Sequence, residues 1–95
     1  MVDLEEVSIK VIRRATQVVE TMTHYQNNAR AIFPTEEHGV LFYWPNSENQ
    51  LTIEVEPSGS VYIHTVDMKA GTFQDESLSA DDNLIVHLAK WLEIA

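Results

Sequence analysis

Apolar residues in the first third of the chain repeat at helical intervals. Between Leu4 and Asn28 they recur every three or four residues in one stripe, which Ile12 and Val19 widen. Charged residues, Arg14 among them, fall on the other side. This period predicts an amphipathic helix with one face toward a core, and Asp3 with Glu6 forms a capping-box pattern at its start.

Phe33-Pro34 ends any helical continuation, since the residue before proline avoids the α region. Residues 35–39 form a polar connector, after which the period changes to two. Val40–Trp44 predicts a first strand that is apolar on both faces. Gln50–Glu56 and Ser60–Val66 predict two further strands with clear alternation.

The two alternating segments predict a β-hairpin that turns through Pro57-Ser58-Gly59. When Glu56 pairs with Ser60, the apolar residues of both strands fall on one side, and a slip of one residue would destroy the match. This register assigns five residues to the core: Leu51, Ile53, Val55, Val61 and Ile63.

Thr72–Glu76 is a candidate fourth strand, and Ser79 is the expected cap of a second helix from Ala80 to about Glu93, whose buried stripe includes Ile85. The sequence therefore predicts one α+β domain over residues 1–95. We expect a long N-terminal helix, a three- to four-stranded antiparallel meander sheet and a C-terminal helix, with both helices packed on one sheet face.

Charge and composition narrow the functional classes. The chain of 95 residues carries 15 acidic and 6 basic side chains, for a net charge of −9. This balance argues against nucleic acid and against an anionic membrane as partners, and it is compatible with a basic protein partner. The chain contains no cysteine, and its first residues lack the apolar segment of a signal peptide. We expect a cytoplasmic protein of bacterial type.

No motif for catalysis, a cofactor or a metal stands out. The four histidines form no metal-binding spacing, and the best local cluster, Glu36-Glu37-His38, is typical of a solvated loop. The sequence has no nucleophile elbow and no glycine-rich phosphate loop. Glu54, Tyr62 and His64 combine acid–base groups, but we expect them on the open, water-exposed side of the sheet, where pKa values stay near normal. We therefore expect neither catalytic residues nor a bound cofactor.

The same open side is the best candidate for an interaction surface, because strand alternation forces some aromatic residues outward. The residues expected on it are Tyr43, Thr52, Glu54, Glu56, Tyr62 and His64.

Phe33-Pro34-Thr35, Gly39-Val40, Trp44 and the segment from Ile53 to Val61 resemble a pattern in a family of small uncharacterised bacterial proteins. In that pattern a Pro-Thr connector and a Gly-Gly pair precede a strand ending near Trp, followed by an Ile-Glu-Val strand and Pro-x-Gly. His38 stands where the pattern has its first glycine. The resemblance implies a small helix–sheet–helix domain and no assigned activity.

These observations favour a non-enzymatic, acidic protein-interaction module, such as an accessory, antitoxin-like or immunity-like protein. It would bind a protein partner, or a second copy of itself, through the open sheet face. Two alternatives stay open: an acidic nucleic-acid mimic that inhibits a DNA-binding protein, and a small ligand-binding domain with His64 or His87 in a groove between the first helix and the sheet.

Overall fold

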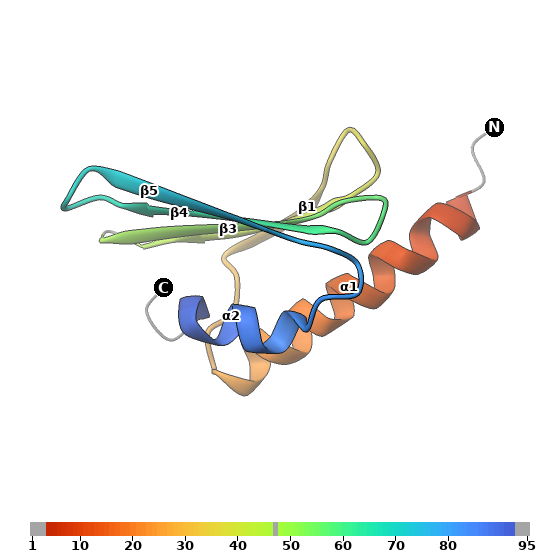
Figure 1. Cartoon of the computed structure of the whole chain (residues 1–95), viewed down its shortest axis with the longest axis horizontal. Helices are drawn as coiled ribbons and strands as arrows, with labels where there is room; N and C mark the ends of the chain where they lie inside the picture. Colours follow the sequence, from red (N-terminus) through yellow and green to blue (C-terminus); the bar gives the residue numbers. More distant parts are fainter. Residues whose placement is uncertain (1–3, 47, 93–95) are drawn as a thin grey trace.

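The computed structural model describes residues 4–46 and 48–92, with side chains from residue 9 onward. The strands form one antiparallel sheet in the order β1-β2-β3-β4-β5, and both helices lie on the same side of it (Figure 1). The elements in chain order are α1 (Leu4–His24), β1 (Ala31–Pro34), β2 (Val40–Pro45), β3 (Asn49–Val55), β4 (Val61–Asp67), β5 (Thr72–Leu78) and α2 (Leu84–Leu92).

The predicted α+β fold is confirmed, with one strand more than expected. The additional strand is β1, which lies between the predicted first helix and the predicted connector at residues 35–39 and includes Phe33-Pro34. It pairs with β2, so that Ile32 lies opposite Phe42 and Pro34 opposite Val40. Pro34 is tolerated because β1 is an edge strand. On the outer side of such a strand no neighbouring strand needs an N–H donor, so the proline removes no hydrogen bond from the sheet.

The helix boundaries also differ from the prediction. α1 ends at His24 instead of Asn28, because Gln26 takes a φ of 54° and the Asn27 N–H donates back to Met22 O at 2.9 Å. Such a left-handed residue with a six-to-one hydrogen bond closes a helix as a Schellman motif. The expected Asp3–Glu6 cap lies outside the described side chains.

α2 begins at Leu84 instead of Ala80, and Ser79 is not its cap. The Asn83 side-chain oxygen accepts from the Val86 N–H at 3.4 Å, the position of an N-cap bond. Ser79 instead closes the preceding turn, where its N–H donates to the Asp82 carboxylate at 2.7 Å and its carbonyl accepts from the Asp82 N–H at 3.1 Å.

The predicted hairpin register is confirmed. Val55 pairs with Val61, Ile53 with Ile63 and Leu51 with Thr65. The Glu56 N–H donates to Ser60 O at 2.8 Å, and Gly59 takes the positive φ of 91° that a glycine adopts without strain.

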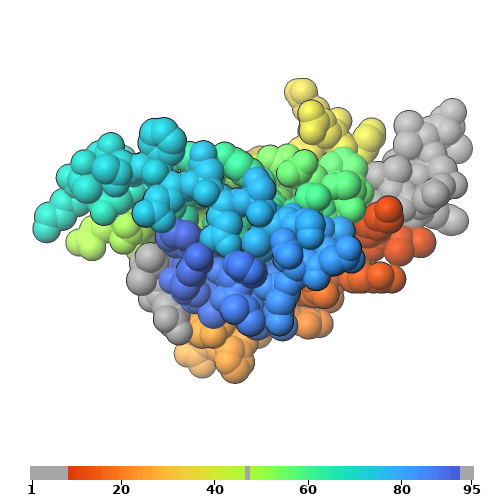
Figure 2. All heavy atoms as spheres, viewed as in Figure 1, coloured from red at the N-terminus to blue at the C-terminus, as the bar shows by residue number. Residues whose placement is uncertain are grey.

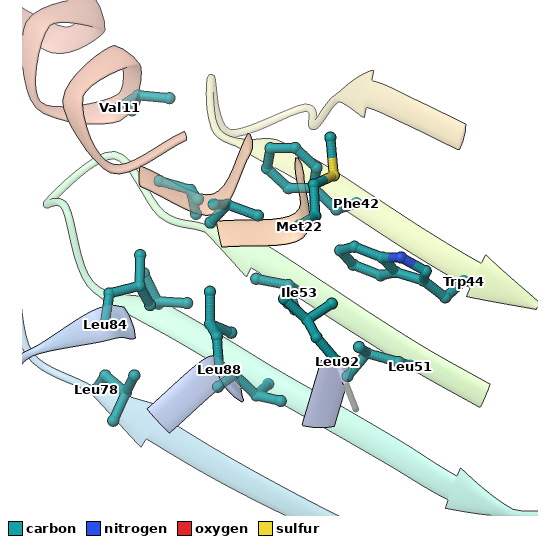
Figure 3. Close-up of a cluster of buried hydrophobic side chains, with 14 residues drawn as sticks. Val11, Met22, Phe42, Trp44, Leu51, Ile53, Leu78, Leu84, Leu88 and Leu92 are labelled. Carbon is teal, nitrogen blue, oxygen red and sulfur yellow. The ribbon is translucent and has the colours of Figure 1, made fainter. Parts of the chain in front are cut away.

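The core lies between the helices and the inner sheet face (Figure 3), and all five hairpin residues assigned to it are buried. α1 contributes Val11, Val18 and Met22, and α2 contributes Leu84, Leu88 and Leu92. Phe42 and Trp44 of β2 stack with ring centroids 6.2 Å apart, and the Trp44 indole N–H donates to Asn27 O at 3.0 Å. The fold therefore satisfies the polar atom of its buried tryptophan.

Three predicted burials are wrong because the helices are rotated relative to the expected stripes. Ile12 is 60% exposed and Ile85 is 52% exposed, and Val19 is also exposed. Arg14, which was expected on the polar side, is only 6% exposed. α1 packs against α2 and the β3–β4 turn with the flank that carries Arg14 and Thr21, and this turns Ile12 and Val19 away from the core.

The Arg14 guanidinium connects three parts of the fold through carbonyl groups. Its Nε–H donates to Gly59 O in the β3–β4 turn at 3.0 Å, and Nη2 donates to Ser79 O at 2.8 Å. Nη1 donates to Gln17 Oε1 at 2.9 Å and to Asp82 O at 3.3 Å. These bonds hold the turn and the connection before α2 against α1.

Replacing Ile53 with Ala should lower the free energy of unfolding by about 2–5 kcal/mol, because the residue is fully buried and its loss leaves a cavity. Urea denaturation followed by circular dichroism measures the change. Ile12→Ala is the matched control and should be nearly neutral, because Ile12 is exposed. Equal losses in the two variants would show that the inner face is misassigned.

Replacing Arg14 with Met should lower the free energy of unfolding by about 2–3 kcal/mol, since it leaves buried carbonyl oxygens without their charged donor. The same change at the exposed neighbour Arg13 should cost less than about 0.5 kcal/mol. Chemical denaturation of both variants checks the difference. If Arg14→Met were as stable as Arg13→Met, the hydrogen bonds from Arg14 to the carbonyl groups would make no measurable contribution to the free energy of unfolding.

Candidate functional site

No helix or strand of the described part of the chain covers the sheet face opposite the helices (Figure 1), and we call it the open face. The strand register sets its side chains in rows across β2, β3, β4 and β5. One row runs Tyr43, Thr52, His64, Asp75, and the next runs Leu41, Glu54, Tyr62, Ser77. Each row follows from strand alternation, because the neighbours of inward residues must point outward.

Three polar side chains on the open face interact with one another. The His64 Nδ1 contacts the Asp75 carboxylate, and hydrogen bonding with His64 and then with Tyr62 holds the pKa of Asp75 below its usual value. The hydrogen bond to Asp75 in turn raises the pKa of the Tyr62 phenol, because a nearby carboxylate disfavours the phenolate. The carboxylate therefore couples β4 to the edge strand β5.

An apolar hollow lies at the end of this face where β4 turns into β5. Its volume is about 350 Å³, and it is bounded by His64, Val66, Met68 and Phe73 together with the Asp67, Gly71 and Thr72 positions of the turn. We call it the Phe73 hollow. Phe73 is 68% exposed and Met68 is 51% exposed, and the His64 and Phe73 rings lie 5.9 Å apart at their centroids. Figure 2 shows this hairpin end projecting beyond α2.

The structure places five of the six residues expected on the interaction surface on the open face. Tyr43, Thr52 and His64 are cross-strand neighbours, and Glu54 lies opposite Tyr62. Glu56 lies just beyond the end of β3, at the start of the turn.

Sequence reasoning missed the contributions of β5 and its turn, namely Met68, Phe73 and Asp75. A signal for them was present in the chain. Extending the hairpin register across a tight turn at residues 68–71 pairs Val66 with Phe73 and His64 with Asp75, as the structure does. The pattern of residues 72–76 predicts only a candidate strand, without a register that assigns its outward residues.

The five strands contain no lysine or arginine, whereas they carry the carboxylates of Glu54, Asp67, Asp75 and Glu76. The cationic residues lie on the helices and in loops, at positions 10, 13, 14, 30, 69 and 90. The fixed charge that the strands contribute is therefore entirely negative.

The other histidine considered for a ligand site, His87, lies on the helix side of the sheet. Its Nδ1 lies 2.7 Å from the Glu76 carboxylate, which also pairs with Lys90 at 3.0 Å and accepts from Trp91 Nε1 at 3.4 Å. Burial raises the pKa of Glu76, but the bonds from Lys90 and His87 outweigh it, and the pKa lies below its usual value. This cluster fastens α2 to β5, while His64 lies on the opposite sheet face.

Among the side chains of residues 9–46 and 48–92, no group of three or more histidines and carboxylates is arranged to hold a metal ion, and this includes Glu36-Glu37-His38. In the same part of the chain, neither helix is long and apolar enough to span a bilayer. Comparisons with protein-family models, with curated proteins and with solved structures found no match to the chain.

Replacing Asp75 with Asn should lower the pKa of Tyr62 toward that of an ordinary tyrosine, because the charge that opposes ionisation is removed. A pH titration of ring-labelled tyrosine by NMR measures it. Glu54→Gln is the control, since Glu54 lies opposite Tyr62 across the strands yet does not perturb it. An unchanged Tyr62 pKa in Asp75→Asn would contradict the coupling.

Proposed function

We propose that this protein is a non-enzymatic interaction module that binds a basic protein partner through the open face. The observation that carries the proposal is the Phe73 hollow, an exposed apolar site on a sheet whose strands hold carboxylates and no cationic side chain. The hollow supplies a place for a partner's apolar side chain, and the surrounding charge selects the kind of partner.

The apolar part of this surface supports binding, because the free energy of the system falls when a partner covers an exposed apolar side chain and displaces the water around it. Phe73 and Met68 keep more than half of their surface in water. Protein interfaces concentrate their binding energy on a few such anchors in a pocket, surrounded by polar residues. Tyr43 and Tyr62 lie on the same face and extend the contact area.

The charge of the surface supports a basic protein over the other partners considered. Glu54 and Asp75 attract lysine and arginine and repel nucleic-acid phosphates. A second copy docked face to face would bring two negative surfaces together, so a homodimer is the less favourable occupant. A cytoplasmic role as an accessory, antitoxin-like or immunity-like protein is consistent with these features and is part of the proposal.

The contact between His64 and Asp75 also suggests acid–base chemistry, which is the reason to consider an enzyme. Their side chains are 37% and 41% exposed. General acid–base groups in enzymes normally lie in a site that limits water and shifts pKa values toward neutrality. The pKa of Asp75 is shifted the other way, away from neutrality. A binding role therefore has the better support.

The nucleic-acid mimic requires carboxylates in rows at phosphate-like spacing. Glu54 lies on the open face, whereas Asp81 and Asp82 lie on the connection before α2, on the helix side. Glu36 lies in the turn between β1 and β2. Carboxylates on such different parts of the fold give the mimic little support.

A photo-crosslinking amino acid in place of Phe73 tests the proposed face in the native host, with the same substitution at Val86 as the control. Val86 is equally exposed but lies on α2. We expect the Phe73 probe to capture a basic protein that the Val86 probe does not. The captured protein, once purified, should bind wild type and lose roughly 10- to 30-fold in affinity with Phe73→Ala, as for an anchor residue.

Three outcomes would contradict the proposal. The first is crosslinking of the same proteins from both positions. The second is capture of a second copy of this chain at Phe73. The third is a purified partner whose affinity changes no more with Phe73→Ala than with Val86→Ala.

A further inference from the structure

A second, separate site lies at the other end of β4, where the β3–β4 turn meets α1 and the connection before α2. The pocket there has a volume of about 260 Å³. α1 contributes Lys10, Arg13 and Arg14, the turn contributes Ser58 and Gly59, and the connection before α2 contributes Asp81. Figure 2 shows this connection lying against the first half of α1. We call this site the Arg14 pocket.

The pocket concentrates positive charge in a strongly acidic chain. It holds three of the six lysine and arginine residues of a protein whose net charge is −9. Arg13 and Arg14 follow Lys10 by three and four residues on α1, so both lie on the same side of the helix as Lys10. Neither Lys10 nor Arg13 forms an ion pair with any residue whose side chain the structure describes.

Arg14 lines the inner wall of the pocket and is 94% buried, the complement of its 6% exposure. Four of its five N–H groups donate to Gly59, Gln17, Asp82 and Ser79, which leaves one Nη2 hydrogen without an acceptor in the described part of the chain. All four acceptors are uncharged carbonyl or amide oxygens. Among the side chains that the structure describes, the buried positive charge therefore has no anionic partner of the kind that such a charge normally has.

The charges of the pocket define its ligand. The described lining residues include three cationic side chains and one carboxylate, that of Asp81, which leave a net charge of +2. This balance matches a phosphate monoester, which carries about −1.5 to −2 at pH 7, better than it matches a single carboxylate. A volume of about 260 Å³ is below the ~300–1,000 Å³ typical of pockets that enclose a drug-sized ligand. It suits a phosphate group and its attached atoms.

We propose that the Arg14 pocket is a binding site for the phosphate group of a phosphorylated ligand. The spare Arg14 N–H provides a donor at the inner wall, and Lys10 and Arg13 bring their positive charges to the anion from α1. The site is independent of the open face, since it lies on the helix side at the opposite end of β4.

Titration of the labelled full chain with inorganic phosphate, followed by NMR, tests the site. Sodium chloride at equal ionic strength is the reference. We expect saturable shifts at the Gly59 and Asp81 amides and at the Arg14 Nε–H. The double variant Lys10→Gln/Arg13→Gln should weaken phosphate binding about tenfold or more. Arg30→Gln/Lys69→Gln removes the same charge from exposed positions outside the pocket and should leave binding nearly unchanged.

Two further titrations separate the sources of the phosphate group. Tighter binding of glycerol phosphate than of inorganic phosphate would assign a small phosphorylated metabolite. Tighter binding of a short phosphoserine peptide would assign a phosphorylated protein segment, and both results support the site. The proposal is overturned if phosphate and chloride cause the same shifts, or if the two double variants lose affinity equally.

Discussion

The pairing of β3 with β4 is the constraint on which the other features of the structure depend. Opposing Ile53 to Ile63 and Val55 to Val61 places a continuous apolar surface on one side of the sheet. Both helices must cover that side. Without them the largest residues of the core would stay in water, and the favourable free energy of burying them would be lost. The other side is left with outward residues that no element among residues 4–46 and 48–92 covers, so the register that builds the core also creates the open face.

The two proposed sites arise from different consequences of this arrangement. The Phe73 hollow forms where the β4–β5 hairpin extends beyond α2. The Arg14 pocket forms at the opposite end of β4, where the β3–β4 turn folds down onto α1. Because different residues line them, substitutions in one site leave the side chains of the other in place. Arg14 has two roles, since its hydrogen bonds hold parts of the fold together and its side chain also lines the Arg14 pocket.

Most of the fold and part of the candidate surface could be predicted from local patterns. The alternation from Gln50 to Val66 is strict enough to give the register, and with it the neighbours Thr52–His64 and Glu54–Tyr62. β1 escaped prediction because a four-residue strand with a proline carries too little periodicity to distinguish it from a connector. Met68, Phe73 and Asp75 were not predicted because their places on the open face follow only when the register is extended across the turn at residues 68–71, and β5 has no apolar alternation of its own.

The sequence by itself determined the order of the two helices and of the strands β2 to β5, the hairpin register and the negative charge of the strands, because each depends on neighbours in the chain or on composition. The tertiary structure decided which flank of α1 is buried. A helical stripe that includes Ile12 and excludes Arg14 is reasonable by periodicity, but the carbonyls of Gly59, Ser79 and Asp82 can hold a guanidinium only once the turn and the connection before α2 have folded against the helix. Those contacts join residues 45 to 68 positions apart, a separation at which no local pattern can record them.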